Sequence, residues 1–124
     1  MKATFTLPAI VLLTITFFSA CTKQDYISSP SDEEVWVRSH EKGSVAYVDT
    51  YAGNYIVETY NGYSVVQSSG GIVPRENDTE YAWFSSQGNQ TIYNYDGNYY
   101  TQERIVQSYL TWSDALIILD NISH

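Results

Sequence analysis

The segment Tyr55–Ser68, YIVETYNGYSVVQS, predicts a β-hairpin. Two runs rich in β-branched and aromatic residues, Tyr55–Tyr60 and Tyr63–Ser68, lie on either side of Asn61-Gly62. Asn-Gly favours the two positive φ angles that a type I′ turn requires, and the runs suit a pleated, half-buried surface. The segment therefore predicts an antiparallel strand pair in which Tyr60 and Tyr63 face each other across the turn.

A second hairpin is predicted around Asp96-Gly97, between the runs Thr91–Tyr95 and Asn98–Gln102. The expected cross-strand pairs are Tyr93 with Tyr100 on one face and Asn94 with Tyr99 on the other. The two hairpins align with an offset of about 35 residues, since Gly53-Asn54 matches Gly88-Asn89. Duplication of one hairpin would explain this match, and so would convergent turn chemistry, because such turns demand Gly and Asn.

The composition from Val35 onward indicates a mainly β domain. Val and Ile far outnumber Leu, and the chain holds twelve tyrosines and three tryptophans, all suited to strands. With the weaker turn signals included, strands are expected at residues 34–39, 44–51, 55–60, 63–68, 80–86, 90–95 and 98–110, the last bent near Gln102–Arg104. We expect a small antiparallel meander, barrel or twisted sandwich of six or seven strands.

The end of the chain changes its hydrophobic period. In Trp112–Asn121, Ser113 is suited to cap a helix, Asp114 favours the first turn, and Asn121 suits the end. The segment predicts about two helical turns, with a final buried strand as the alternative, because so short an apolar run fits both.

Residues 1–20 have the layout of a secretory signal. One cation, Lys2, precedes the apolar run Leu7–Phe18, and small residues follow. A transmembrane helix is the alternative, but spanning a bilayer takes roughly 20 apolar residues. An ordinary signal peptidase site before Cys21 would place Phe18 at position −3, where a small residue is needed.

The tetrapeptide Phe18-Ser19-Ala20-Cys21 resembles the lipobox of bacterial lipoproteins, with Phe18 where the family has Leu. The resemblance implies that Cys21 is lipidated and becomes the first residue of the mature chain. An unpaired thiol would be unusual in an exported protein, and Cys21 is the single cysteine. Several acyl chains would hold the protein stably on a membrane, where one chain holds only marginally.

Residues 21–34 are expected to form a flexible tether, because so polar a segment buries too little surface to offset its ordering entropy. Its acidic end, Ser31–Glu34, resembles the surface-export signal of Bacteroidota lipoproteins but lies ten residues after Cys21, so a solvated charge run is the alternative. By resemblance, Thr22 after the lipidated cysteine implies the outer membrane of a Gram-negative bacterium, without indicating which side the domain faces. Residues 35–124 form the predicted single β-rich domain.

The net charge of the whole chain is −8. Without Lys2 the mature chain keeps five Lys and Arg residues against fourteen Asp and Glu. Such a surface repels nucleic acid, so no nucleic-acid partner is expected.

Few residues form a pattern that predicts catalysis or metal binding. His40 and His124 lack neighbours at metal-ligand spacing, and Glu58 and Glu103 are the carboxylates considered for glycoside hydrolysis, without a spacing that pairs them. A weak calcium candidate is the oxygen-rich segment Glu76, Asp78 and Glu80, which lacks the frame of a calcium loop. No cofactor is expected, and we expect a protein that is not an enzyme.

Tyrosines are more numerous than so small a core needs. Tyr60, Tyr63, Tyr93 and Tyr100 are the candidate binding residues, because exposed aromatic rows bury area at low entropy cost. Cross-strand stabilisation is the alternative use of the same rings. The sequence therefore favours a lipid-anchored envelope protein that binds a protein or glycan through a tyrosine-rich face. A structural subunit of an envelope complex and a small hydrolase are the alternatives.

Overall fold

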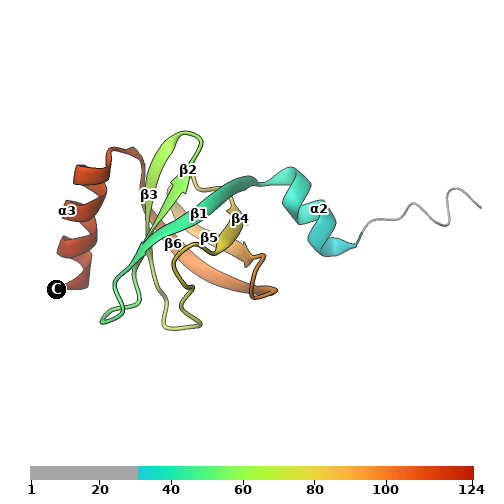
Figure 1. The fold of residues 1–124 in the computed structure, drawn as a ribbon, viewed down its shortest axis with the longest axis horizontal. Helices are drawn as coiled ribbons and strands as arrows, with labels where there is room; N and C mark the ends of the chain where they lie inside the picture. Colours follow the sequence, from blue (N-terminus) through green and yellow to red (C-terminus); the bar gives the residue numbers. More distant parts are fainter. Residues whose placement is uncertain (1–30) are drawn as a thin grey trace, which may run out of the picture. The chain divides into compact units, whose positions relative to one another are not determined.

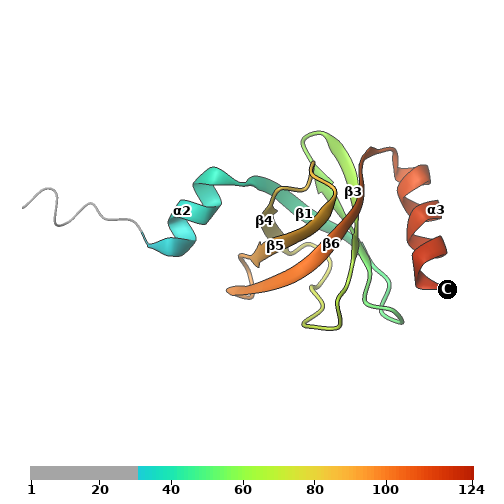
Figure 2. The same ribbon diagram turned by 180° about the vertical axis from the view of Figure 1, so that it is seen from behind.

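The computed structural model describes residues 31–124, which contain two helices and six strands (Figures 1 and 2). The elements in chain order are α2 (Asp32–Ser39), β1 (Glu41–Val48), β2 (Tyr55–Thr59), β3 (Gly62–Gln67), β4 (Thr79–Ala82), β5 (Gly88–Asn94), β6 (Tyr99–Leu110) and α3 (Trp112–Ser123). The predictions for residues 1–20, for Cys21 and for most of the 21–34 tether fall outside the described residues.

The six strands close into an antiparallel barrel in the order β1-β2-β3-β6-β5-β4. The barrel consists of two three-stranded meanders, β1-β2-β3 and β4-β5-β6, joined by the pairs β3–β6 and β1–β4. The mainly β prediction is confirmed, and among the expected architectures the barrel is the one observed. Only two residue pairs, Glu80↔Asn94 and Tyr81↔Tyr93, join β4 to β5.

The barrel has two hydrophobic cores. Its interior is filled from all six strands by Val45, Val48, Tyr55, Val57, Val66, Ala82, Phe84, Ile92 and Ile105. A second core lies outside the barrel, where Ile56 and Val65 pack against Ala115 and Leu119 of α3. Successive residues of a strand point to opposite faces. In the first hairpin Val57 and Val66 therefore point into the barrel, while Ile56 and Val65 point outward to α3.

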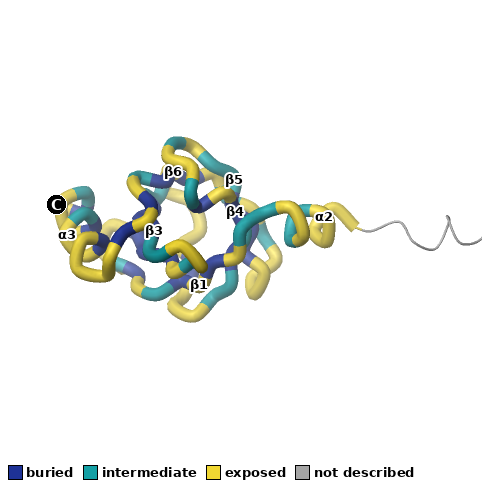
Figure 3. The backbone as a smooth tube through the Cα atoms, turned by 90° about the horizontal axis from the view of Figure 1, so that it is seen from above, coloured by how far each residue is buried: buried dark blue, intermediate teal, exposed yellow. Residues whose placement is uncertain are grey.

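The prediction of a strand at residues 34–39 is wrong, because this segment belongs to the helix α2. Ser31 precedes the helix and Glu34 lies three residues later, a spacing typical of a capping box. Acidic residues in the first turn and Arg38 in the last complement the helix dipole, and Glu34 pairs with Arg38 at 3.4 Å. The acidic run expected to extend the tether therefore starts a helix. Figure 3 shows α2 as exposed and intermediate along its length, and none of its residues is buried.

The C-terminal helix is confirmed, but its limits differ from the prediction. Thr111 caps α3, since its hydroxyl accepts a hydrogen bond from the Asp114 amide at 3.2 Å, so Ser113 lies inside the helix. The helix continues past Asn121 to Ser123 because Leu119, near its end, is buried in the second core.

The turn of the first hairpin also differs from the prediction. Thr59 pairs with Gly62, so Tyr60 and Asn61 form the turn and Gly62, at φ 113°, starts β3. An Asn-Gly sequence fits this arrangement, in which the glycine takes the left-handed position after the turn, as well as it fits a type I′ turn. Glu58, and not Tyr60, therefore faces Tyr63 across the strands.

In the second hairpin the predicted pairs Tyr93↔Tyr100 and Asn94↔Tyr99 are confirmed. The positive φ angle there belongs to Asn98, at 55°. Gly97 is required for a different reason, because a Cβ at this position would lie 2.3 Å from the ring of Tyr99. The pairing of β6 with β3 is irregular at two places, between Leu110 and Gln107, where Tyr109 has φ 58°, and between Gln107 and Ile105. Neither place falls within Gln102–Arg104.

Candidate functional site

Five aromatic rings form an unbroken row where α2 meets the second meander; we call it the aromatic row. Its members, in spatial order, are Trp83, His40, Trp36, Tyr100 and Tyr93. Successive ring centroids lie 4.7, 3.8, 5.5 and 4.8 Å apart. The row joins the end of α2, the loop after β4, and strands β5 and β6.

Trp36 is the centre of this row. It lies one helical turn before His40, and the two rings stack with an interplanar angle of 9°. Its indole Nε1 donates a hydrogen bond of 2.9 Å to the carbonyl of Tyr81 on β4. The rings of Trp36 and Tyr100 pack edge to face, with an interplanar angle of 88°. These contacts hold α2 on the outer face of the barrel.

The row has one buried member, Tyr93, at one end, and two exposed members, Tyr100 beside it and Trp83 at the other end. Tyr93 is 4% exposed, and its hydroxyl donates to Asn98 Oδ1 at 2.7 Å. Burial raises the pKa of the Tyr93 hydroxyl. Tyr100 and Trp83 remain 42% and 46% exposed. Solvent therefore reaches large aromatic surface at positions 100 and 83, while Tyr93 supports the strands beneath.

The four tyrosines proposed as one binding face do not lie together. Tyr93 and Tyr100 belong to the aromatic row. Tyr63 packs against Trp112 at 5.1 Å, where α3 begins, and its hydroxyl donates to Glu58 at 3.3 Å. Tyr60 is fully exposed at the tip of the first turn. The expected single face is therefore wrong in its membership.

Sequence reasoning missed Trp36, His40 and Trp83 as members of the row. Trp36 and His40 are four residues apart, a spacing that brings side chains together on a helix but separates them along a strand. The four-residue spacing of Trp36 and His40 would have predicted their contact if residues 34–39 had been assigned to a helix.

The calcium candidate separates into two parts. The Asp78 and Glu80 carboxylates both accept hydrogen bonds from the Asn94 side-chain amide, at 3.0 and 3.3 Å. Glu76 is directed elsewhere, since it accepts from the backbone amide of Val48 at 3.2 Å. Within residues 31–124 no group of three His, Cys, Asp or Glu side chains is arranged to hold a metal ion.

Glu80 is a buried acid inside the barrel. Its side chain is 1% exposed, and Oε1 has no hydrogen-bond partner among the described residues. Burial raises the pKa of Glu80 to about 7. The Tyr55 hydroxyl and the Asn94 amide oppose this rise by stabilising the charged form, whereas the negative charges of Asp78 and Glu103 add to it.

Glu58 and Glu103 are not brought together as a catalytic pair. Glu58 is exposed on β2 beside Tyr63, whereas Glu103 is buried on β6 and accepts two hydrogen bonds from Ser69. Burial raises the pKa of Glu103, and the bonds from Ser69 partly counter the rise. Glycoside hydrolysis needs two carboxyl groups flanking one bond, so these two residues do not meet its requirement.

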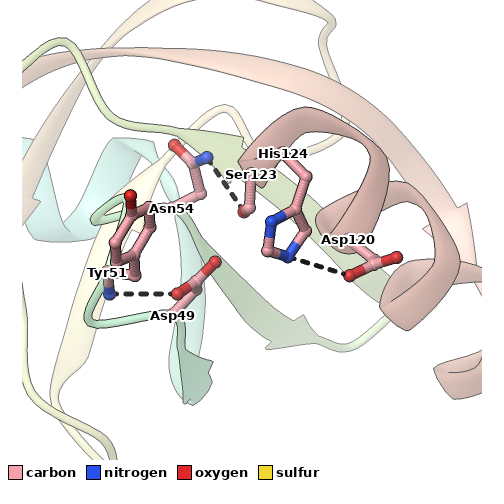
Figure 4. A network of polar contacts seen from close by, with 6 residues as sticks. All are labelled: Asp49, Tyr51, Asn54, Asp120, Ser123 and His124. Atoms are coloured by element: carbon pink, nitrogen blue, oxygen red, sulfur yellow. Dashed lines mark hydrogen bonds and ion pairs between the residues drawn. The ribbon is translucent and has the colours of Figure 1, made fainter.

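A polar network ties the β1–β2 loop to the end of α3 (Figure 4). Asn54 donates to Ser123 Oγ at 3.2 Å, and a hydrogen bond from Ser123 lowers the pKa of Asp49. His124 pairs with Asp120 at 3.2 Å on the surface. These contacts fasten a loop to a helix, which is a structural role.

None of the helices formed by residues 31–124 has the length and apolar character needed to cross a bilayer. No family model, curated protein or solved structure matches this chain.

Proposed function

We propose that this chain is a lipid-anchored protein of the bacterial cell envelope, and that its barrel binds a protein partner through the exposed rings of the aromatic row. The anchor rests on Cys21, the single cysteine, at the end of an apolar leader. The outer membrane of a Gram-negative bacterium is the proposed location. The binding role rests on the row itself, with Trp83 and Tyr100 exposed.

The ring geometry favours a protein over a glycan at this surface. A glycan that binds by stacking on aromatic rings needs open, flat ring faces, whereas Trp36 has one face covered by His40 and meets Tyr100 nearly at a right angle. Protein interfaces instead use Trp and Tyr as anchors that fill pockets of the partner. The row therefore presents ring edges and the exposed indole of Trp83, and it offers no flat surface on which a sugar ring could stack.

A shallow apolar pocket beside α2 extends this surface. It encloses about 250 Å³ and is lined by Val37, Tyr95 and the stems of Glu33, Glu34 and Arg38. An apolar floor with a charged rim is the usual anatomy of a protein interface. The pocket and the exposed rings together give a partner a hydrophobic centre with charges around it.

Photo-crosslinking in intact cells tests the binding role. A photoreactive amino acid replaces Trp83 or Tyr100 in the full-length chain, and Tyr51, an exposed tyrosine on the β1–β2 loop, serves as the matched control position. We expect one protein adduct of defined mass from positions 83 and 100 and none from position 51. Equal adducts from all three positions, or none from any, would contradict the proposal.

Metabolic labelling tests the anchor separately. Radiolabelled palmitate should enter the wild-type chain and not Cys21→Ala, and the variant should leave the membrane fraction. Equal labelling of both chains would remove the lipoprotein assignment while leaving the crosslinking result intact.

A further inference from the structure

A polar groove lies where β3, β6 and β5 are adjacent, beside the residues that follow the end of β3. It encloses about 400 Å³ and is lined by Gln67, Ser68, Ser69, Asn89, Gln102, Glu103 and Arg104. The register explains why these residues meet: Arg104 of β6 is the partner of Gln67 on one side and of Asn89 on the other. None of the aromatic-row residues lines the groove.

The groove side chains are held in place by bonds to one another. Arg104 Nη1 donates to Gln67 Oε1 at 3.0 Å, and Gln102 Nε2 donates to the Thr91 hydroxyl at 2.5 Å. Ser69 Oγ donates to the backbone carbonyl of Gln102, also at 2.5 Å. Binding a ligand therefore requires little further ordering of these side chains.

Glu103 gives the groove a fixed acceptor. Its side chain is 3% exposed, and Oε1 accepts from both the amide and the hydroxyl of Ser69, at 3.3 and 2.9 Å. Oε2 accepts no hydrogen bond from the described residues. Because Glu103 lines the groove, Oε2 is the oxygen through which this mostly buried side chain can accept a hydrogen bond from a ligand hydroxyl.

The lining chemistry excludes most classes of ligand. An apolar ligand needs hydrophobic and aromatic walls, a phosphate is held best by several cations or backbone amides, and calcium needs six to eight oxygens with more than one carboxylate. This groove offers one cation, Arg104, and one carboxylate, Glu103. Its remaining polar groups are side-chain amides and hydroxyls, which donate and accept at once.

A ligand that matches this surface must be uncharged and must donate and accept many hydrogen bonds in a small space, as sugar hydroxyls do. We propose that the groove on β3, β6 and β5 is a binding site for a neutral saccharide. This site is distinct from the aromatic row and does not depend on the proposed protein partner.

NMR titration of the ¹⁵N-labelled full-length chain in detergent micelles tests the site. The probes are neutral tetrasaccharides of glucose, mannose, galactose and N-acetylglucosamine, together with inorganic phosphate and Ca²⁺. We expect at least one tetrasaccharide to shift the side-chain amide signals of Gln67, Asn89 and Gln102 in a saturable way. Neither inorganic phosphate nor Ca²⁺ should do so.

Two variants and a control separate recognition from folding. Arg104→Ala and Glu103→Gln should each weaken binding about tenfold, since each removes a charged hydrogen-bonding group. Gln107→Ala, at an exposed position of the same strand and outside the groove, should bind as the wild type does. Amide spectra of the backbone verify that each variant is folded.

Three results would overturn the proposal. They are the absence of saturable shifts with every tetrasaccharide, shifts with phosphate or Ca²⁺ in place of the sugars, and sugar binding that survives Arg104→Ala but is lost in Trp83→Ala. The last result would indicate that the saccharide binds at the aromatic row and not in the groove. Failure of the crosslinking experiment at positions 83 and 100 would leave the groove unaffected.

Discussion

The buried carboxyl of Glu80 predicts that this protein loses stability as the pH rises towards neutrality. The pKa of Glu80 is about 7 in the folded chain, against an ordinary value of 4.5. Between these two values the folded state holds a proton that the unfolded chain has released. The free energy of unfolding therefore falls as the pH rises from about 4.5 to about 7, and this contribution is constant above that range.

The magnitude follows from the size of the pKa shift. One pKa unit corresponds to about 1.4 kcal/mol, so the rise from 4.5 to about 7 costs about 3 kcal/mol once Glu80 is ionised. Such a cost is reasonable for this position, because Oε1 has no hydrogen-bond partner within residues 31–124 and the Asp78 carboxylate shares the Asn94 amide. The total free energy of unfolding of a small domain is roughly 5–15 kcal/mol, so the cost of ionising Glu80 is a large part of it.

Glu80→Gln isolates this term, because glutamine has nearly the shape of glutamate and carries no charge. Urea unfolding of both chains from pH 4.5 to pH 8 should give similar stabilities at the acidic end. At pH 8 the variant should be more stable by about 3 kcal/mol.

Glu33→Gln, at an exposed position on α2, is the matched control, and its stability should equal that of the wild type from pH 4.5 to pH 8. The raised pKa of Glu103 adds a slope of the same sign in both chains, and only its charge interaction with Glu80 differs between them. Parallel profiles for wild type and Glu80→Gln, or a less stable variant at pH 8, would refute the reasoning.

Substitutions at Gly43, Thr111 and Trp36 test three further local contacts. Gly43→Ala places a Cβ 2.3 Å from a buried valine methyl, so urea unfolding should show a loss of about 1–3 kcal/mol, whereas Gly71→Ala, with nothing within 4 Å, should show little change. Thr111→Ala removes the cap of α3, whose hydroxyl accepts from the Asp114 amide, and should cost about 1 kcal/mol; Thr111→Ser should restore most of it. Trp36→Ala should abolish hydrogen-exchange protection in α2 and leave the barrel amides protected, and equal loss in both would contradict the aromatic attachment of this helix.

Local signals predicted most of the strands but not the closure of the barrel. The pairing of the second hairpin, Tyr93 with Tyr100 and Asn94 with Tyr99, was predicted correctly, although its loop takes residues 95–98 and not Asp96-Gly97 alone. The pairs β1–β4 and β3–β6 join segments far apart in sequence, and no local pattern encodes such contacts. Open sheet, sandwich and barrel therefore remained equivalent until the structure was known.

The errors arose where one local pattern fits two conformations. Asn61-Gly62 suits both a type I′ turn and a turn followed by a left-handed glycine, and tertiary pairing with β6 places Gly62 where a Cβ would lie 3.0 Å from the Leu110 carbonyl. Residues 34–39 contain Val35, Trp36 and Val37, which are residue types common in strands, yet the capping residues at 31–34 favour a helix. Glu80 could have been placed inside, because it shares its strand face with Ala82 and Phe84, both fully buried.

The two helices differ in what they contribute to the fold, and this difference supports the placement of the proposed partner site. α3 buries Ala115 and Leu119 against Ile56 and Val65, so the barrel depends on it for its second core. α2 has no buried residue and is attached mainly through Trp36. Segments with few buried contacts open at low free energy, and binding surfaces are drawn from such segments. A partner that contacts the aromatic row could therefore reorient α2 without unfolding the barrel, whereas a partner that displaced α3 would expose a core. Trp83 and Tyr100, the exposed rings of the aromatic row, thus contact His40 and Trp36 at the element that the fold can most easily spare.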